Sequence, residues 1–506
     1  MFNNFRQSMA WLHTWSGLLL CWLLFFIFVT GSLGYFDNAI DRWMKPELPY
    51  IESFDDLTLA IDAAQSYLQE HALGADSWYL TLPEPRHPYL HAQWRGELNG
   101  EAVFDGEGNK LPHRETGGGQ WLYALHFKLH YLPIKFAYWI VCGAGLIMLI
   151  ALTSGAIIHK KIFIDFFTFR SGKRARTWLD LHNLLSVSAL PFHLMITYSG
   201  LLFLSSTFQK PLYDTHYGVR GGGYQHFYNE FFGPSHLPPS GSYATPTSLS
   251  DILADAQSLW EGHPVRLLTV AQPNDKNSVT RLIRMIGPNV EISDRLYYQS
   301  STGDPISYTP AVSFSKDLRM LLVNLHEGLF ADTGLRWLFF ISGLAGAGMI
   351  ATGLIVWMEK RRQKREETVG YNANEVIERA NIGVLLGTPI AVVTYFWANR
   401  LIPSNWPERE ILEQNSFFIA LFGALIWSLL RGRGGLRHLL WLTALLYGLL
   451  PWVDYWLGGA GVINTLISGD ITLLSFNLVL MMTAILVVGF LIKNHCANTI
   501  QLKKYP

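Results

Sequence analysis

The sequence contains little cysteine and little charge. Three of its 506 residues are cysteines, and all three lie in or beside apolar segments, at Cys21, Cys142 and Cys496. This excludes a disulfide framework and leaves packing as their expected role. Charged residues make up 15% of the chain, and the 39 basic residues equal the 39 acidic ones. A balanced charge identifies no partner by itself, and it gives no reason to expect a nucleic acid.

Two kinds of motif are absent as well. The first apolar run, 18–35, is too long for the apolar core of a signal peptide, so we expect a retained helix rather than a cleavable leader. The basic loops that follow the apolar runs contain no G-x-G-x-x-G stretch or other nucleotide cradle. A nucleotide bound in these loops is therefore not expected.

Hydrophobic residues, in contrast, make up half of the chain. Apolar runs of about 20 residues recur, which is the length that crosses about 30 Å of hydrocarbon. The sequence therefore predicts an all-α polytopic membrane protein with about eight transmembrane helices and two α/β insertions. The predicted segments are a first helix at 1–36, an insertion at 37–120, a histidine-bearing segment with the second helix at 121–161, a basic loop at 162–177, a third helix at 178–206, a second insertion at 207–316, a histidine-bearing segment with the fourth helix at 317–365, and four further helices within 380–495.

Lysine and arginine predict the orientation of these helices. The loops 159–177 and 359–365, the stretch 431–437 and the last residues 503–506 are all basic. All four fall on one side if there are eight helices, and basic loops mark the cytoplasmic side. We therefore expect both termini in the cytoplasm and the two insertions in the other compartment, which is the periplasm if the source is a Gram-negative bacterium.

Each insertion carries the same succession of patterns. DDLTLAIDAAQSYLQEH in the first and SLSDILADAQSLWEGH in the second have the apolar spacing of an amphipathic helix. Short alternating runs follow in both, among them YLHAQWRG and RLYYQSS, and these predict strands.

The membrane part contains an internal repeat. When 121–161 and 321–361 are aligned on His126 and His326, Gly143 matches Gly343, Gly145 matches Ala345, and Gly155 lies near Gly353. The first and third helices also match, because His13 precedes Gly31 by 18 residues and His182 precedes Gly200 by 18. This agreement indicates duplication of a unit made of a helix, an insertion, a Leu-His pair and a second helix.

The duplicated histidines suggest a chemistry. Ionisable residues in membrane helices are costly and by default mark a functional site. We expect His13 with His182 near the cytoplasmic side, and His126 with His326 on the periplasmic side, each pair supplying two axial nitrogens to one haem iron. The sequence has no Cys-x-x-Cys-His motif for covalent attachment, so the haem would be b-type. The alternative for any single histidine is an ordinary hydrogen-bonded side chain.

The small residues at 143–145 and 343–348 allow either a flat macrocycle or a neighbouring helix to approach closely. The depths of the histidines leave further alternatives. For straight helices, His126 lies about 43 Å above His182 at 1.5 Å per residue, which is too far for good tunnelling between two haems. Either the helices tilt and Pro133 bends the second one, or another site lies between them. His193 and His130 are therefore alternative ligands of the outer haem, or part of a third site. The other possibility for His193 is a buried histidine bonded to carbonyls that Pro191 releases.

At this point a family resemblance is visible. The stretches that carry this resemblance are FRQSMAWLHTWSGLLL, the two Leu-His repeats and ALPFHLMITYSG. In them the sequence resembles the PepSY-associated transmembrane proteins, the iron-regulated PiuB-like group of the inner membrane. The insertions, with AIDAAQ and FDGEGNK and with ILADAQ and YQSSTGDP, look like the PepSY-type modules of that family. The resemblance covers about 1–365, and the last four helices extend beyond the family's four-helix core. Members include di-haem b reductases that pass electrons to ferric siderophores in the periplasm.

The resemblance implies a function for the histidine pairs. We expect an oxidoreductase with two haem b groups, or three, that reduces iron held by a siderophore or another Fe(III) chelate. Its electron donor would be membrane quinol or a separate cytoplasmic reductase. Two other functions stay open, namely a permease for a siderophore or its iron, and a non-enzymatic regulator whose PepSY-type segments bind a periplasmic partner.

Overall fold

The computed structural model describes residues 4–502 except 50, 52–53, 55, 85, 160–173, 234–236, 286–293, 307–313, 364–372 and 460. The chain forms two compact units. The first comprises Met1–Glu47, Arg114–Leu201 and Thr333–Pro506, and the second comprises Leu48–His113 and Leu202–Asp332. The expected basic loop at 162–177 falls largely outside the described residues.

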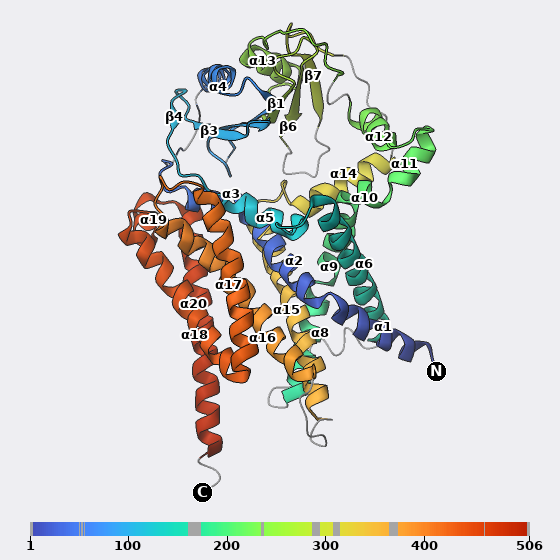
Figure 1. Ribbon diagram of the computed structural model, residues 1–506, viewed down its shortest axis with the longest axis vertical. Helices are drawn as coiled ribbons and strands as arrows, with labels where there is room; N and C mark the ends of the chain where they lie inside the picture. The colour runs from blue at the N-terminus through green and yellow to red at the C-terminus, as the bar shows by residue number, and fades with distance from the viewer. Residues whose placement is uncertain are drawn as a thin grey trace. The chain divides into compact units, whose positions relative to one another are not determined.

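The first unit is helical (Figure 1). Its elements are α1 (Phe5–Leu19), α2 (Cys21–Leu33), the 3₁₀ turn η1 (Gly34–Phe36), α3 (Asp37–Met44), α5 (Gly118–Lys128), α6 (Ile134–Ile158), α8 (Arg174–Ser188), most of α9 (Leu190–Phe203), α15 (Thr333–Gln363), α16 (Ala373–Leu401), α17 (Arg409–Arg431), α18 (Arg433–Trp456), α19 (Val462–Ser468) and α20 (Ile471–Leu502).

The helices are long and apolar enough for a multi-pass membrane protein. Among the described residues, seven stretches could each cross a bilayer, and the bent pair Ala175–Ser188 and Leu190–Phe203 could form an eighth. The seven are Cys21–Met44, Ile134–Ile158, Thr333–Arg362, Ala373–Leu401, Arg409–Arg431, Gly434–Trp456 and Ile471–Lys493. This agrees with the prediction of a mostly helical polytopic protein with about eight spans.

Two of the expected helices are not continuous. The first breaks at Leu20, whose φ of −128° and ψ of 26° lie outside the α region, so α1 is separate from the span that begins at Cys21. The third bends by 65° between α8 and α9. Pro191 lies in the first turn of α9, where its missing N–H is tolerated. The depth difference of about 43 Å holds only for straight helices, so it does not apply to this bent pair.

The packing of the first unit repeats the duplication. In one half α1 packs on α6, and in the other α8 packs on α15. Apolar side chains of α2, α6 and α15 close the space between the halves in one buried cluster, which contains Cys21, Leu24, Phe25, Phe28, Ala144, Met148, Leu152, Ala347, Met349, Ile350 and Leu354. The repeat in the sequence therefore corresponds to a repeat of helix pairs.

The second unit contains a seven-stranded antiparallel sheet in the order β4-β3-β2-β1-β5-β6-β7. The strands are β1 (Ala75–Thr81), β2 (Leu90–Gly96), β3 (Gly100–Phe104), β4 (Lys110–Leu111), β5 (Val265–Ala271), β6 (Val279–Arg284) and β7 (Arg295–Gln299). Strands β1 to β4 come from the first insertion and β5 to β7 from the second. The α/β patterns thus form one shared sheet, joined where β1 pairs with β5.

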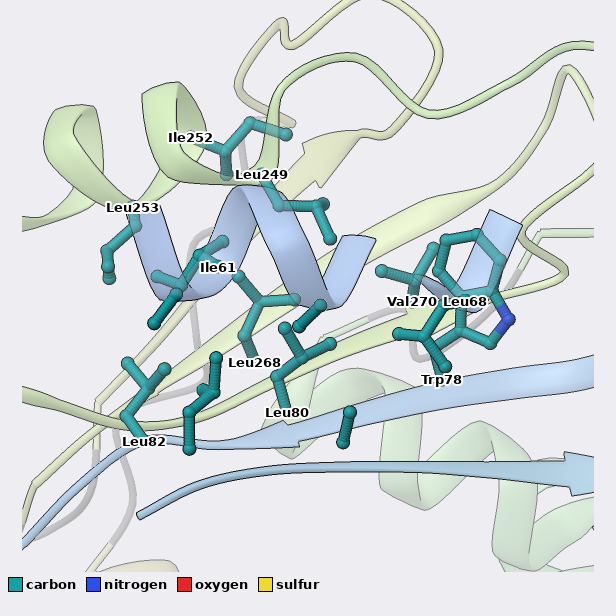
Figure 2. Packing of buried hydrophobic residues seen from close by; sticks show 14 of the residues in the cluster. Ile61, Leu68, Trp78, Leu80, Leu82, Leu249, Ile252, Leu253, Leu268 and Val270 are labelled. Atoms are coloured by element: carbon teal, nitrogen blue, oxygen red, sulfur yellow. The ribbon is translucent and has the colours of Figure 1, made fainter. Parts of the chain in front are cut away.

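Two helices, one from each insertion, cover a face of this sheet. They are α4 (Thr58–His71) and α13 (Leu249–Leu259). Figure 2 shows Ile61 and Leu68 of α4 and Leu249, Ile252 and Leu253 of α13 packed against strand residues such as Trp78, Leu80 and Val270. The remaining helices of the unit are α10 (Ser205–Phe208), α11 (Lys210–Tyr217), α12 (Gly223–Phe232) and α14 (Phe314–Glu327).

Candidate functional site

The imidazoles of His13 and His182 face each other inside the first unit. His13 lies on α1 and His182 on α8, and their ring centroids are 6.3 Å apart at an interplanar angle of 61°. The residues are 169 positions apart in sequence, yet they occupy equivalent places in the two copies of the repeat. The structure therefore brings together the pair that the duplication predicts.

Each ring is held by the same hydrogen bond. His13 donates from Nδ1 to the carbonyl of Ala151 at 2.9 Å, and His182 donates from Nδ1 to the carbonyl of Met349 at 2.8 Å. A carbonyl oxygen only accepts, so Nδ1 carries the proton in both rings. Both imidazoles can therefore be neutral, with the lone pair of Nε2 free for a ligand bond.

A glycine makes each of these bonds possible. Gly155 follows Ala151 by four residues on α6, and Gly353 follows Met349 by four on α15. A Cβ atom at Gly155 would come within 3.0 Å of Cε1 of His13, and one at Gly353 within 3.2 Å of Cε1 of His182. The missing side chain lets each ring lie against the neighbouring helix. The match of Gly155 near Gly353 in the repeat is the sequence signal for these two contacts.

Both histidines line one cavity of about 520 Å³. Its volume is in the range of about 300–1,000 Å³ typical of pockets for small molecules and cofactors. Its walls come from both halves of the repeat and are mainly apolar, with Leu18, Leu24, Met148, Leu152, Leu190, Met349, Ile350 and Leu354 among the lining residues.

This arrangement suits a metal that needs only two protein ligands. Two metal–nitrogen bonds of about 2 Å each, plus the distance from each nitrogen to the centroid of its ring, add up to about the 6.3 Å that separates the two ring centroids. Among the described residues, no group of three or more His, Cys, Asp or Glu side chains could hold a bare metal ion. Two axial imidazoles are sufficient when a macrocycle supplies the other four ligands.

The structure places His126 and His326 in different units. His126 lies on α5, where Nδ1 donates to the carbonyl of Tyr123, and its ring lies against Gly31 of α2, 3.6 Å from where a Cβ would stand. Burial lowers the pKa of His126 to about 4, so its imidazole is neutral at pH 7. His326 lies on α14, with its ring centroid 5.2 Å from that of Phe203. Their pairing around one haem stays a prediction.

His193 and His130 have other contacts. His193 is fully buried and donates from Nε2 to the carbonyl of Ser342 at 3.1 Å. This contact favours the alternative of a hydrogen-bonded histidine, although the carbonyl belongs to α15 and is not one that Pro191 releases. His130 accepts from Nε1 of Trp121 at 3.2 Å and stacks on Phe418 at a centroid distance of 5.3 Å.

The small residues of α6 and α15 mainly receive neighbouring helices. A Cβ at Gly145 would meet Leu201, one at Gly343 would meet Ser32, and one at Gly346 would meet Phe28. Close helix packing, rather than the approach of a macrocycle, explains these positions.

The described residues include three buried ion pairs, of which two connect C-terminal helices to each other or to α3 and the third lies within α17. They are Arg42 with Asp470, Arg400 with Asp454, and Arg409 with Glu413. Sequence reasoning assigned these helices no role, although the charges at the ends of four apolar runs were a usable signal. Glu413 also accepts hydrogen bonds from the Thr116 hydroxyl and the Asn399 amide, and Thr116 lies just before α5, which carries His126.

The comparisons with known proteins agree with this repeat. No curated protein matches the chain significantly. The family model described as the PepSY-associated TM region matches residues 10–360. The matched part contains both copies of the repeat and all six histidines discussed above, whereas α16 to α20 lie outside it. The chain belongs to the PepSY-associated TM region family.

Proposed function

We propose that this protein is a b-type haem protein of the bacterial inner membrane that carries electrons across the bilayer to ferric iron held by a siderophore or another chelate. The observation that carries the proposal is the pair of His13 and His182, which face each other across a cavity lined by both halves of the repeat. The family membership adds the resemblance to ferric-siderophore reductases. The basic loops support cytoplasmic termini and a periplasmic sheet.

The protein's own residues prepare the inner site. The carbonyls of Ala151 and Met349 fix the tautomer and orientation of the two rings and make each Nε2 a better electron donor. The apolar walls of the cavity would keep water away from a metal bound between the two rings. A haem bound here would supply one-electron chemistry by cycling its iron between the ferrous and ferric states.

Support for a second haem is of a different kind. His126 and His326 match within the repeat, and His126 is held neutral by burial. A neutral imidazole is the form that binds a metal. We propose that these two residues are the ligands of the outer haem, and that the electron donor is membrane quinol or a separate reductase.

Purification of the full chain provides the first test. We expect a red preparation with a Soret band and a pyridine haemochrome count of two haem b per chain. His13→Ala and His182→Ala should each remove one haem, and His126→Ala and His326→Ala the other. Full haem content in all four variants would contradict the ligand assignment. A colourless protein would instead favour a permease or a regulator of a periplasmic partner.

A second experiment tests the acceptor. Protein reduced with dithionite is freed of excess reductant and mixed anaerobically with ferric chelates while the haem spectrum is recorded. We expect reoxidation together with formation of Fe(II), which a ferrous-specific dye detects. A red protein that no ferric chelate reoxidises would be an electron carrier with a different acceptor.

A further inference from the structure

The cavity between His13 and His182 has two chemically different ends. The apolar residues described above line most of it, but Arg6, His159 and Lys360 also line it. None of the described residues that line the cavity is acidic. The cavity therefore suits a ligand that is apolar over most of its surface and negatively charged at one edge.

The three basic residues lie on the same side of the histidine pair. His159 is the residue directly after α6 and follows Gly155 by four residues, and Lys360 follows Gly353 by seven, or about 10 Å along α15. On α1, Arg6 precedes His13 by seven residues, again about 10 Å. The spacing of seven also keeps Lys360 and Arg6 on the helix faces that carry Gly353 and His13.

The hydrogen bonds of the basic end leave donors for a ligand. Nδ1 of His159 is buried and has no hydrogen-bond partner among the described atoms. A buried polar atom without a partner is costly, and one that lines a cavity indicates that the partner belongs to a ligand. Arg6 donates from Nε to the carbonyl of Ile158 at 3.1 Å. Ile158 directly precedes His159, so this bond holds the guanidinium close to that residue's backbone. The guanidinium has four other N–H donors.

We propose that Arg6, His159 and Lys360 bind the two propionate carboxylates of the haem that His13 and His182 ligate. This inference rests on the proposed function. Haem b combines an apolar vinyl edge with a dicarboxylate edge, which is the division that the cavity presents. Guanidinium and ammonium groups form charge-assisted hydrogen bonds with carboxylates, and His159 adds a third donor. The three residues therefore fix which edge of the macrocycle faces the basic loops.

The test compares haem b with its dimethyl ester, in which both carboxylates are blocked. The parent in this test is the full-length apoprotein with His126→Ala and His326→Ala, which leaves one haem site to titrate. It is reconstituted with each porphyrin, and the affinity is read from the Soret band. We expect the parent to bind haem b about tenfold more tightly than the diester. The triple variant Arg6→Gln, His159→Gln, Lys360→Gln should lose this preference and still bind the diester as the parent does.

The matched control is Arg361→Gln. Arg361 is the neighbour of Lys360, but its guanidinium lies over the ring of Trp357 at 4.0 Å, and we expect the preference for haem b to persist. A triple variant that keeps the parent's full preference would overturn the carboxylate assignment and leave the haem proposal intact. If the parent gives no Soret shift with either porphyrin, the haem proposal fails, and this inference fails with it.

Discussion

The imidazole of His13 lies directly against Gly155, where an added Cβ would come within 3.0 Å of the ring. Gly155→Ala should therefore displace the ring and weaken its bond to the Ala151 carbonyl. Overpacking of this kind costs about 1–3 kcal/mol, which corresponds to a roughly five- to 150-fold loss of affinity for the haem that we propose between His13 and His182. Haem titration of the variant measures the loss, and the low-spin EPR signal of the inner haem should change because its ligand plane rotates.

Gly143→Ala on the same helix is the control, since nothing lies within 4 Å of its added Cβ. Helix propensity favours alanine by about 1 kcal/mol there, so stability should be equal or higher and haem content unchanged. If Gly155→Ala binds haem as tightly as Gly143→Ala does, the close contact has no role in ligation.

The ion pair of Arg409 and Glu413 should be a strong determinant of stability. Both side chains are fully buried, and Arg409 also donates to the carbonyls of Glu115 and Asn399. Glu413→Ala leaves an uncompensated buried charge, which costs about 3–5 kcal/mol. Thermal unfolding of the full chain in detergent measures the effect. The double variant Arg409→Met, Glu413→Met removes both charges and should regain part of the lost stability.

A partly exposed pair on α16 provides the comparison. Arg379 and Glu375 are 31% and 39% exposed, so Glu375→Ala should cost less than about 1 kcal/mol. Equal losses of stability in Glu413→Ala and Glu375→Ala would mean that burial of the Arg409–Glu413 pair does not increase the cost of breaking it.

Much of the site could be predicted because duplication leaves a record in sequence. Matching positions of His13 and His182 predicted their pairing, and the structure brings their rings to 6.3 Å. The hydrogen bonds to Ala151 and Met349 could not be predicted, because a carbonyl partner has no side-chain signature. The bend between α8 and α9 was also missed, since a proline in the first turn of a helix is compatible with either a continuous or a broken span.

The shared sheet was missed for a related reason. Alternating patterns predicted the strands of each insertion, but the pairing of β1 with β5 joins residues about 190 positions apart. Periodicity identifies the buried face of a strand and contains no information about its neighbour. The buried pairs Arg400 with Asp454 and Arg42 with Asp470 are likewise contacts whose partners only the fold reveals.

The shared sheet predicts that the two insertions unfold together. Trp78 on β1 is fully buried and pairs with Trp94 on one side and Val270 on the other. Trp78→Ala should cost about 3–5 kcal/mol, because it leaves a large cavity. Hydrogen exchange should rise both in β2 of the first insertion and in β5 and β6 of the second.

Leu98→Ala is the control for this experiment, since Leu98 is 59% exposed in the turn between β2 and β3. Its exchange pattern should match that of the parent. Faster exchange confined to 75–104 in Trp78→Ala would show that the insertions are energetically independent.

Asp275 lies in the turn between β5 and β6 and should make the stability of the second unit depend on pH in the acidic range. Its carboxylate accepts backbone N–H groups of Ser240 at 3.0 Å, Gly241 at 2.9 Å and Asn277 at 2.7 Å, and the Ser240 hydroxyl at 2.8 Å. The bond from Ser240 is the main cause that lowers the pKa of Asp275 from 3.8 to about 2. The folded state therefore favours the ionised form more than the unfolded state does.

Linkage between protonation and folding gives the direction in which pH changes the stability. With a depressed pKa in the folded state, the stabilisation is complete above about pH 4, falls as the pH drops from about 4 to 2, and is absent below. Unfolding temperatures of the parent should exceed those of Asp275→Asn by a constant margin from pH 7 to about 4.5, and the margin should shrink towards pH 2. Asp251→Asn removes the same charge from an exposed position on α13 and should give a small margin at every pH. A margin for Asp275→Asn that is as large at pH 2.5 as at pH 7 would mean that the carboxylate's charge does not stabilise this turn.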